Sequence, residues 1–155
     1  MNHTDQKQMN PYIKFTLMIL TSTVVMYIMM YLNTYEWSHV YFSETRAYMA
    51  LYMGAAMAVI MLAFMTNMYK KTKINLMIYG LSVLLFAVGI WGVRSQATVD
   101  QVSWMKAMIP HHSIAILTSS RADIEDPRVR ELADGIIETQ KREIKEMEAL
   151  IEELE

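Results

Sequence analysis

Three long apolar stretches separate the charged parts of this chain. Residues 12–32, 48–68 and 74–93 are nearly free of charged side chains. Each approaches the roughly 20 apolar residues that a hydrocarbon core of about 30 Å requires. Aromatic residues of the kind that settle at membrane interfaces stand near the ends of these stretches, at Tyr12, Tyr31, Tyr35, Trp37, Tyr48, Tyr69 and Trp91. The pattern predicts three transmembrane helices in an all-α protein.

Basic residues set the expected orientation, because Lys and Arg collect in cytoplasmic loops. Lys70, Lys71 and Lys73 follow the second stretch, so this loop and the N-terminus should lie inside. The loop over residues 33–47 carries two glutamates and one arginine, and is expected outside. In a bacterial-type inner or plasma membrane, the chain then divides into a cytoplasmic tail (1–11), a three-helix transmembrane domain (12–93) and an extracytoplasmic hairpin domain (94–155).

The last part of the chain predicts two helices joined by a short turn. The first begins near Asp100, a favourable N-cap residue, and ends near Arg121. Asp126 followed by Pro127 marks a second start, since proline is favoured at the first helical position. This helix runs to about Leu154, and the short connection makes the two helices antiparallel neighbours.

Heptad-spaced positions predict how the two helices face each other. They are Ala133, Ile137, Gln140, Ile144, Met147, Ile151 and Leu154 in the second helix, and Trp104, Met108, His111, Ala115, Thr118 and Ala122 in the first. This register places His111 opposite Gln140, and Trp104 near Met147. One hairpin has too little apolar surface for a core. We therefore expect half of a four-helix bundle, completed in a homodimer or higher homo-oligomer.

Composition narrows the possible functions. Hydrophobic residues make up 54% of the chain and charged residues 19%, and both fractions differ from those of soluble proteins in the direction of membrane proteins. The net charge of −2 gives no reason to expect a nucleic-acid partner. The absence of cysteine excludes disulfides, cysteine zinc sites and thiol catalysis. No nucleophile paired with a base and no glycine-rich phosphate loop is present, so no enzyme is expected. A metal site would still be compatible with redox chemistry.

The densest group of potential metal ligands lies in the first helix of the hairpin, at Met105, Met108, His111 and His112. The last three share one helix face through i, i+3 and i+4 spacing. Thioether sulfur suits Cu(I), and imidazole suits copper in either oxidation state, whereas zinc and iron favour cysteine, more histidines or several carboxylates. The alternative is structural: methionine fills gaps in many cores, and a His111–Gln140 hydrogen bond would satisfy both side chains without metal.

Several separated segments resemble one known family. They are Met-Ile-Pro-His-His at 108–112, Ala115-Ile116, Asp126-Pro-Arg-Val-Arg, Ile136-Ile137, Gln140, Glu143-Ile144 and Met147. Over about residues 99–152 the chain resembles the ferritin-like family called domain of unknown function 305. Its members are typically extracytoplasmic helical bundles, and some bind copper or silver in metal homeostasis.

The resemblance implies a ligand set and a metal. The ligands would be Met105, Met108, His111, His112 and Met147, with Gln140 and Glu143 as nearby polar groups, and the predicted register adds Trp104 to their surroundings. The implied metal is Cu(I), with Ag(I) as the second candidate. Two departures bear on this set: Ser113-Ile114 replaces the pair often found after the two histidines, and Leu117 stands where many members have methionine.

A second methionine array lies in the middle apolar stretch, at Met49, Met53, Met57, Met61, Met65 and Met68. A step of four residues drifts about 40° on a straight helix, so the array winds around the helix. It fits either a membrane path for Cu(I) or methionines that only pack or face lipid. The second interpretation is favoured, because the stretch holds no ionisable partner of the kind that marks transport paths.

The leading hypothesis is a membrane-anchored, extracytoplasmic protein that binds Cu(I) or Ag(I) in copper homeostasis or delivery. Its expected partners are the lipid bilayer, other copies of the chain and a metal-handling membrane protein. Two other functions fit the same sequence. One is a structural or assembly subunit that binds no metal, and the other is a small methionine-lined metal transporter.

Overall fold

The computed structural model describes residues 9–155, and within this range it contains helices and loops but no strand. The helices are α1 (Pro11–Met29), the 3₁₀ turn η1 (Trp37–His39), α2 (Glu44–Phe64), α3 (Thr72–Ser95), α4 (Gln101–Arg121) and α5 (Pro127–Leu154). The predicted all-α architecture, three apolar helices followed by further helices, is confirmed. Residues 1–8, most of the predicted cytoplasmic tail, lie outside the described residues.

Side-chain caps fix where most of the helices begin. Asp100 accepts a hydrogen bond from the Ser103 amide at 2.8 Å, and Asp126 caps α5 in the same way through the Arg128 amide at 2.9 Å. Ser43 caps α2 through the Arg46 amide at 3.2 Å. The helix therefore starts at Glu44, four residues before the first residue of the charge-free stretch, and it ends at Phe64 rather than Met68.

Helices α1, α2 and α3 are each long and apolar enough to cross a membrane, with mean hydropathies of 1.6, 1.9 and 2.2. Helix α2 contacts both of the others. Small residues allow this close approach: Gly54 lies against Thr23 of α1, and Gly89 lies against the backbone of Tyr48 in α2. These three helices support association of the chain with a membrane.

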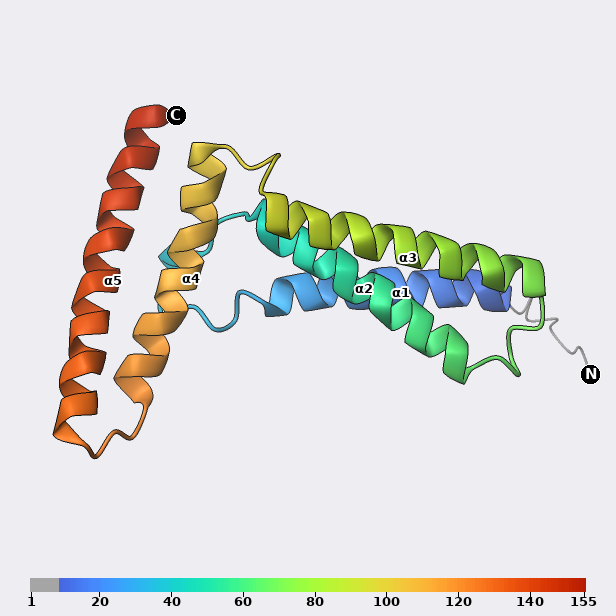
Figure 1. The fold of residues 1–155 in the computed structure, drawn as a ribbon, viewed down its shortest axis with the longest axis horizontal. Helices are drawn as coiled ribbons and strands as arrows, with labels where there is room; N and C mark the ends of the chain where they lie inside the picture. The colour runs from blue at the N-terminus through green and yellow to red at the C-terminus, as the bar shows by residue number, and fades with distance from the viewer. Residues whose placement is uncertain (1–8) are drawn as a thin grey trace, which may run out of the picture.

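Helices α4 and α5 form an antiparallel pair that stands across one end of the three apolar helices (Figure 1). Helix α4 is the inner member, because it contacts both α2 and η1. The start of α1 and the α2–α3 loop lie at the opposite end of the three helices. The hairpin thus packs where α1 ends, α2 begins and α3 ends.

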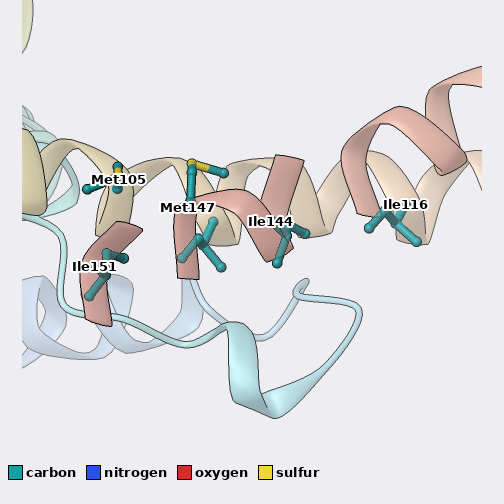
Figure 2. Packing of buried hydrophobic residues seen from close by; sticks show 6 residues of the cluster. Met105, Ile116, Ile144, Met147 and Ile151 are labelled. Carbon is teal, nitrogen blue, oxygen red and sulfur yellow. The ribbon is translucent and has the colours of Figure 1, made fainter. Parts of the chain in front are cut away.

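The hairpin core is apolar and comes from both helices (Figure 2). It consists of Met105, Ile109, Ile116, Ile144, Met147 and Ile151, all buried. The predicted seam of α5 is largely confirmed, because Ala133, Ile144, Met147 and Ile151 are buried, although Leu154 is exposed.

The predicted seam of α4 is wrong by about one residue. Trp104, His111 and Thr118 are exposed, whereas Met105, Ile109 and Ile116 face α5. Two isoleucines bury more apolar surface than the alanine and threonine of the predicted seam, and this favours the observed rotation. A second side of α4 is also buried, at Ala107, Pro110 and Ser113.

Candidate metal site in the hairpin

Three thioethers gather between α4 and α5. Met105 from α4 and Met147 from α5 are only 5% and 7% exposed and belong to one buried cluster (Figure 2). Met108 is partly buried and packs against the same cluster. The sulfur-bearing members of the predicted ligand set are therefore brought together by the fold, from helices that are separate in sequence.

His112 reaches α5 beside this cluster. Its Nε2 lies 2.9 Å from Oε2 of Glu143, and its Nδ1 lies 2.9 Å from the carbonyl oxygen of Met108. Gln140 Nε2 donates to the same Glu143 oxygen at 3.4 Å. The predicted polar surroundings, Gln140 and Glu143, thus meet His112. The predicted pairing of His111 with Gln140 is wrong, because the rotation of α4 turns the next residue toward α5.

The two hydrogen bonds of His112 determine how it could bind metal. A backbone carbonyl and an ionised carboxylate both only accept hydrogen bonds. Both hydrogen bonds of His112 can therefore form together only when each ring nitrogen carries a proton. A neutral imidazole loses one of these bonds and gains a free lone pair. His112 can therefore become a ligand through Nε2 by leaving Glu143, while the Met108 carbonyl oxygen at Nδ1 orients the ring.

His111 lies on another side of α4. It is exposed, its ring centroid is 6.1 Å from that of His112, and it lines a cavity together with Met108 between the hairpin and the apolar helices. Trp104 is 49% exposed and is not a member of the buried cluster. The structure thus sets Met105, His112 and Met147 toward the α4–α5 contact, with Met108 between this cluster and the cavity that His111 lines, and leaves Trp104 exposed.

A polar link that sequence reasoning missed holds the hairpin against the α1–α2 loop. The Ser113 hydroxyl is fully buried, accepts a hydrogen bond from the Tyr35 amide at 2.7 Å, and lies 2.9 Å from Nδ1 of the buried His39. The sequence held one indication of this contact: Ser113 is a small polar residue four positions after Ile109 and three before Ile116, so it lies within an apolar stripe of the helix.

The donor set fits a soft metal. Within residues 9–155, no three His, Asp or Glu side chains form a group that could hold a metal ion. The residues that pack together instead are Met105, Met108 and Met147, next to His112, which is hydrogen-bonded to the Met108 carbonyl oxygen. Thioethers with one imidazole are a soft donor set of the kind that suits Cu(I).

The methionines of the second array do not form one continuous feature. Met53, Met57, Met61 and Met65 line a shallow apolar groove of about 490 Å³ along α2. Met49 instead lines the cavity beside α4, and Met68 is exposed in the loop after α2.

Comparison with known proteins adds two findings. Residues 94–154 match the family model described as Domain of unknown function (DUF305). An uncharacterized protein of Acanthamoeba polyphaga mimivirus is 34% identical over 108 residues, which cover 68% of this chain and 69% of that protein. No solved structure matches this chain.

Proposed function

The chain belongs to the DUF305 family, and on this premise we propose that its hairpin is a membrane-anchored site that binds Cu(I) or Ag(I) in copper homeostasis or delivery. One observation carries the proposal. Met105, Met108 and Met147 converge from both helices of the hairpin, beside an imidazole that can be released from a hydrogen bond. Thioethers have weak affinity for hard cations, so such a group selects soft ones.

Each residue has a separate role in this proposal. Met105 and Met147 supply sulfur from inside the core, and Met108, which is partly exposed, supplies sulfur at its edge. His112 supplies the imidazole after it leaves Glu143. The Met108 carbonyl oxygen, which accepts from Nδ1–H, then holds the ring in position as outer-shell groups do in many metal sites, while Glu143 and Gln140 remain as nearby polar groups. His111 faces another side of α4 and has no role in this group.

We place the hairpin outside the cytoplasm. The α2–α3 loop, which carries the lysines, and the start of α1 lie together at the end of the apolar helices opposite the hairpin (Figure 1). Lysine-rich loops favour the cytoplasmic side, and on this basis the hairpin lies on the other side of the membrane. Leu132, Ile136 and Leu150 are exposed along α5, which suits pairing with a second copy. A site there could exchange metal with a metal-handling membrane protein.

Cu(I) competition titration of the full-length protein in mild detergent tests the proposal. Met147→Leu and Met105→Leu should each raise the Cu(I) dissociation constant by about tenfold or more. Mutation of an outer-shell partner already lowers metal affinity by about this factor, and loss of a direct ligand should cost at least as much. Leucine conserves volume, so each change should cost less than about 1.5 kcal/mol of stability. Met77→Leu is the matched control, because Met77 is 73% exposed on α3 and should leave Cu(I) affinity unchanged.

Two results would contradict the proposal. One is equal Cu(I) affinity of the wild type and Met147→Leu, and the other is no wild-type binding tighter than micromolar. His112→Ala separates the metal site from a purely structural hairpin. If His112 is a ligand, His112→Ala should bind Cu(I) more weakly than His111→Ala. If His112 is only structural, His112→Ala should lower the thermal stability and leave the Cu(I) affinity unchanged.

A further inference from the structure

A cavity of about 260 Å³ lies where the hairpin meets the apolar helices. Met30 and Asn33, just after α1, form one wall. The first turns of α2, with Arg46 and Met49, form the second, and α4 closes the cavity with residues that include Met108 and His111. The cavity therefore sits at the level where membrane-crossing helices end.

Arg46 is a buried charge without an acidic partner in the part of the chain that the structure describes. It is 8% exposed. Its Nη1 donates to the Met30 carbonyl oxygen, and its guanidinium carbon lies 4.3 Å from the centroid of the Tyr31 ring. Among the described residues, no carboxylate forms an ion pair with it. A buried charge is costly unless an opposite charge or several hydrogen bonds compensate it.

The unused donors of this guanidinium open onto the cavity. A guanidinium has five N–H donors, and the Met30 carbonyl engages only part of them. Yet no fully buried side-chain nitrogen or oxygen among residues 9–155 lacks a partner. The remaining donors of Arg46 are therefore not sealed inside protein, and Arg46 lines the cavity. The N-terminus of α2 adds partial positive charge at the same place.

The other walls are mainly apolar. Met30, Met49, Ala107, Met108 and Ile114 surround the cavity, while His111 is exposed at its α4 side. A free inorganic anion would use the guanidinium and gain nothing from the thioethers. A molecule with an anionic head and an apolar body would use both. Acidic phospholipids have this chemistry, and the phosphates of a bilayer lie at the level where membrane-crossing helices end.

We propose that this cavity binds the headgroup phosphate of an acidic phospholipid, with Arg46 as its charge partner and Met30 and Met49 against its apolar part. The bound lipid would join α1, α2 and α4, and so hold the hairpin on the membrane domain. Arg46 is not part of the proposed metal site, and among the described residues Met108 is the one that packs against the methionine cluster and also lines this cavity.

The test measures lipid binding to the full-length, delipidated protein in mild detergent by native mass spectrometry. The probes are phosphatidylglycerol, phosphatidylcholine and inorganic phosphate. Wild-type protein should retain phosphatidylglycerol in preference to phosphatidylcholine. Arg46→Gln should weaken phosphatidylglycerol binding by about tenfold or more, the effect of losing a charge-assisted hydrogen bond.

The matched control is Arg94→Gln, because Arg94 is an exposed arginine in the last turn of α3, at the same end of the helices. It should leave phosphatidylglycerol binding unchanged. If Arg46→Gln does not fold, Ala107→Phe should weaken lipid binding by filling the cavity without a change of charge. The proposal would be overturned if the wild type binds the two lipids equally, or if Arg46→Gln and Arg94→Gln lose binding equally. It would also be overturned if neither Arg46→Gln nor Ala107→Phe weakens binding, or if inorganic phosphate displaces phosphatidylglycerol.

Discussion

Ser113 shows how one side chain can decide the position of a domain. Its hydroxyl has no exposed surface and binds the loop between α1 and α2 through the Tyr35 amide and the His39 ring. Glutamine or a larger residue would not fit a site with no exposed surface without moving this loop. The small size of Ser113 therefore permits this contact between the hairpin and the α1–α2 loop.

Ser113→Ala should weaken this contact. Alanine removes the hydroxyl that contacts the Tyr35 amide and Nδ1 of the buried His39, and a buried polar group left without a partner costs about 1–3 kcal/mol. The expected result is a lower unfolding temperature of the full-length protein in mild detergent, and faster proteolysis of the 33–43 loop. Ser120→Ala is the control, because Ser120 is exposed and its hydroxyl donates only to a carbonyl within its own helix. Equal behaviour of the two variants would contradict the proposed role of Ser113.

At the scale of elements, α2 and α3 pack closely because α3 has glycines where the two helices meet. A Cβ at Gly89 would lie 2.9 Å from Cβ of Tyr52 and 3.0 Å from the carbonyl oxygen of Tyr48. The second of these atoms belongs to the backbone and cannot turn aside. Gly80 of the same helix has open space around it, with no atom within 4 Å of such a Cβ.

Gly89→Ala should separate the two helices. Moving packed helices apart should cost about 1–3 kcal/mol, as for other overpacked sites. Gly80→Ala adds the same methyl group without contact and should be neutral or stabilising by up to about 1 kcal/mol, through helix propensity. Thermal unfolding of both variants in one detergent measures the difference. Destabilisation by Gly80→Ala alone would refute the packing shown for α3.

At the scale of the whole molecule, α5 has two apolar sides in different surroundings. One side packs on α4, and a neighbouring side exposes Leu132, Ile136 and Leu150. Exposed apolar surface of this kind is characteristic of protein–protein contacts. With the hairpin outside the cytoplasm, two such sides would complete the expected four-helix bundle in a homodimer.

A single introduced cysteine tests both parts of this arrangement, since the chain has none of its own. In intact cells, Leu132→Cys should react with a membrane-impermeant maleimide, and a short bis-maleimide should link it into a dimer. Glu138→Cys, exposed on another side of α5, should react with the same maleimide but should not form the linked dimer. No labelling of either variant would place the hairpin in the cytoplasm, and equal cross-linking of both would refute pairing through Leu132.

The sequence by itself determined the elements. Three apolar stretches of membrane-spanning length, Asp100 and the Asp126–Pro127 pair predicted the helices and two of their starts, because span length and N-capping depend on neighbouring residues. The α5 face with Ile144, Met147 and Ile151 was also predictable, since these residues follow an unbroken heptad spacing along the helix. For the candidate site, the sequence predicted its residues but not which of them lie together.

Only the tertiary structure decided the rotation of α4. This helix packs on two sides, against α5 and against the α1–α2 loop, so its periodicity has no single apolar face. The fold sets Met105 and His112 against α5, and turns His111 toward the cavity at Arg46. Arg46 belongs to α2, which α3 separates from α4 along the chain, so no local sequence pattern indicates that Arg46 and α4 meet. A helix with two buried sides is oriented by the sum of its contacts, and these exist only once the chain is folded.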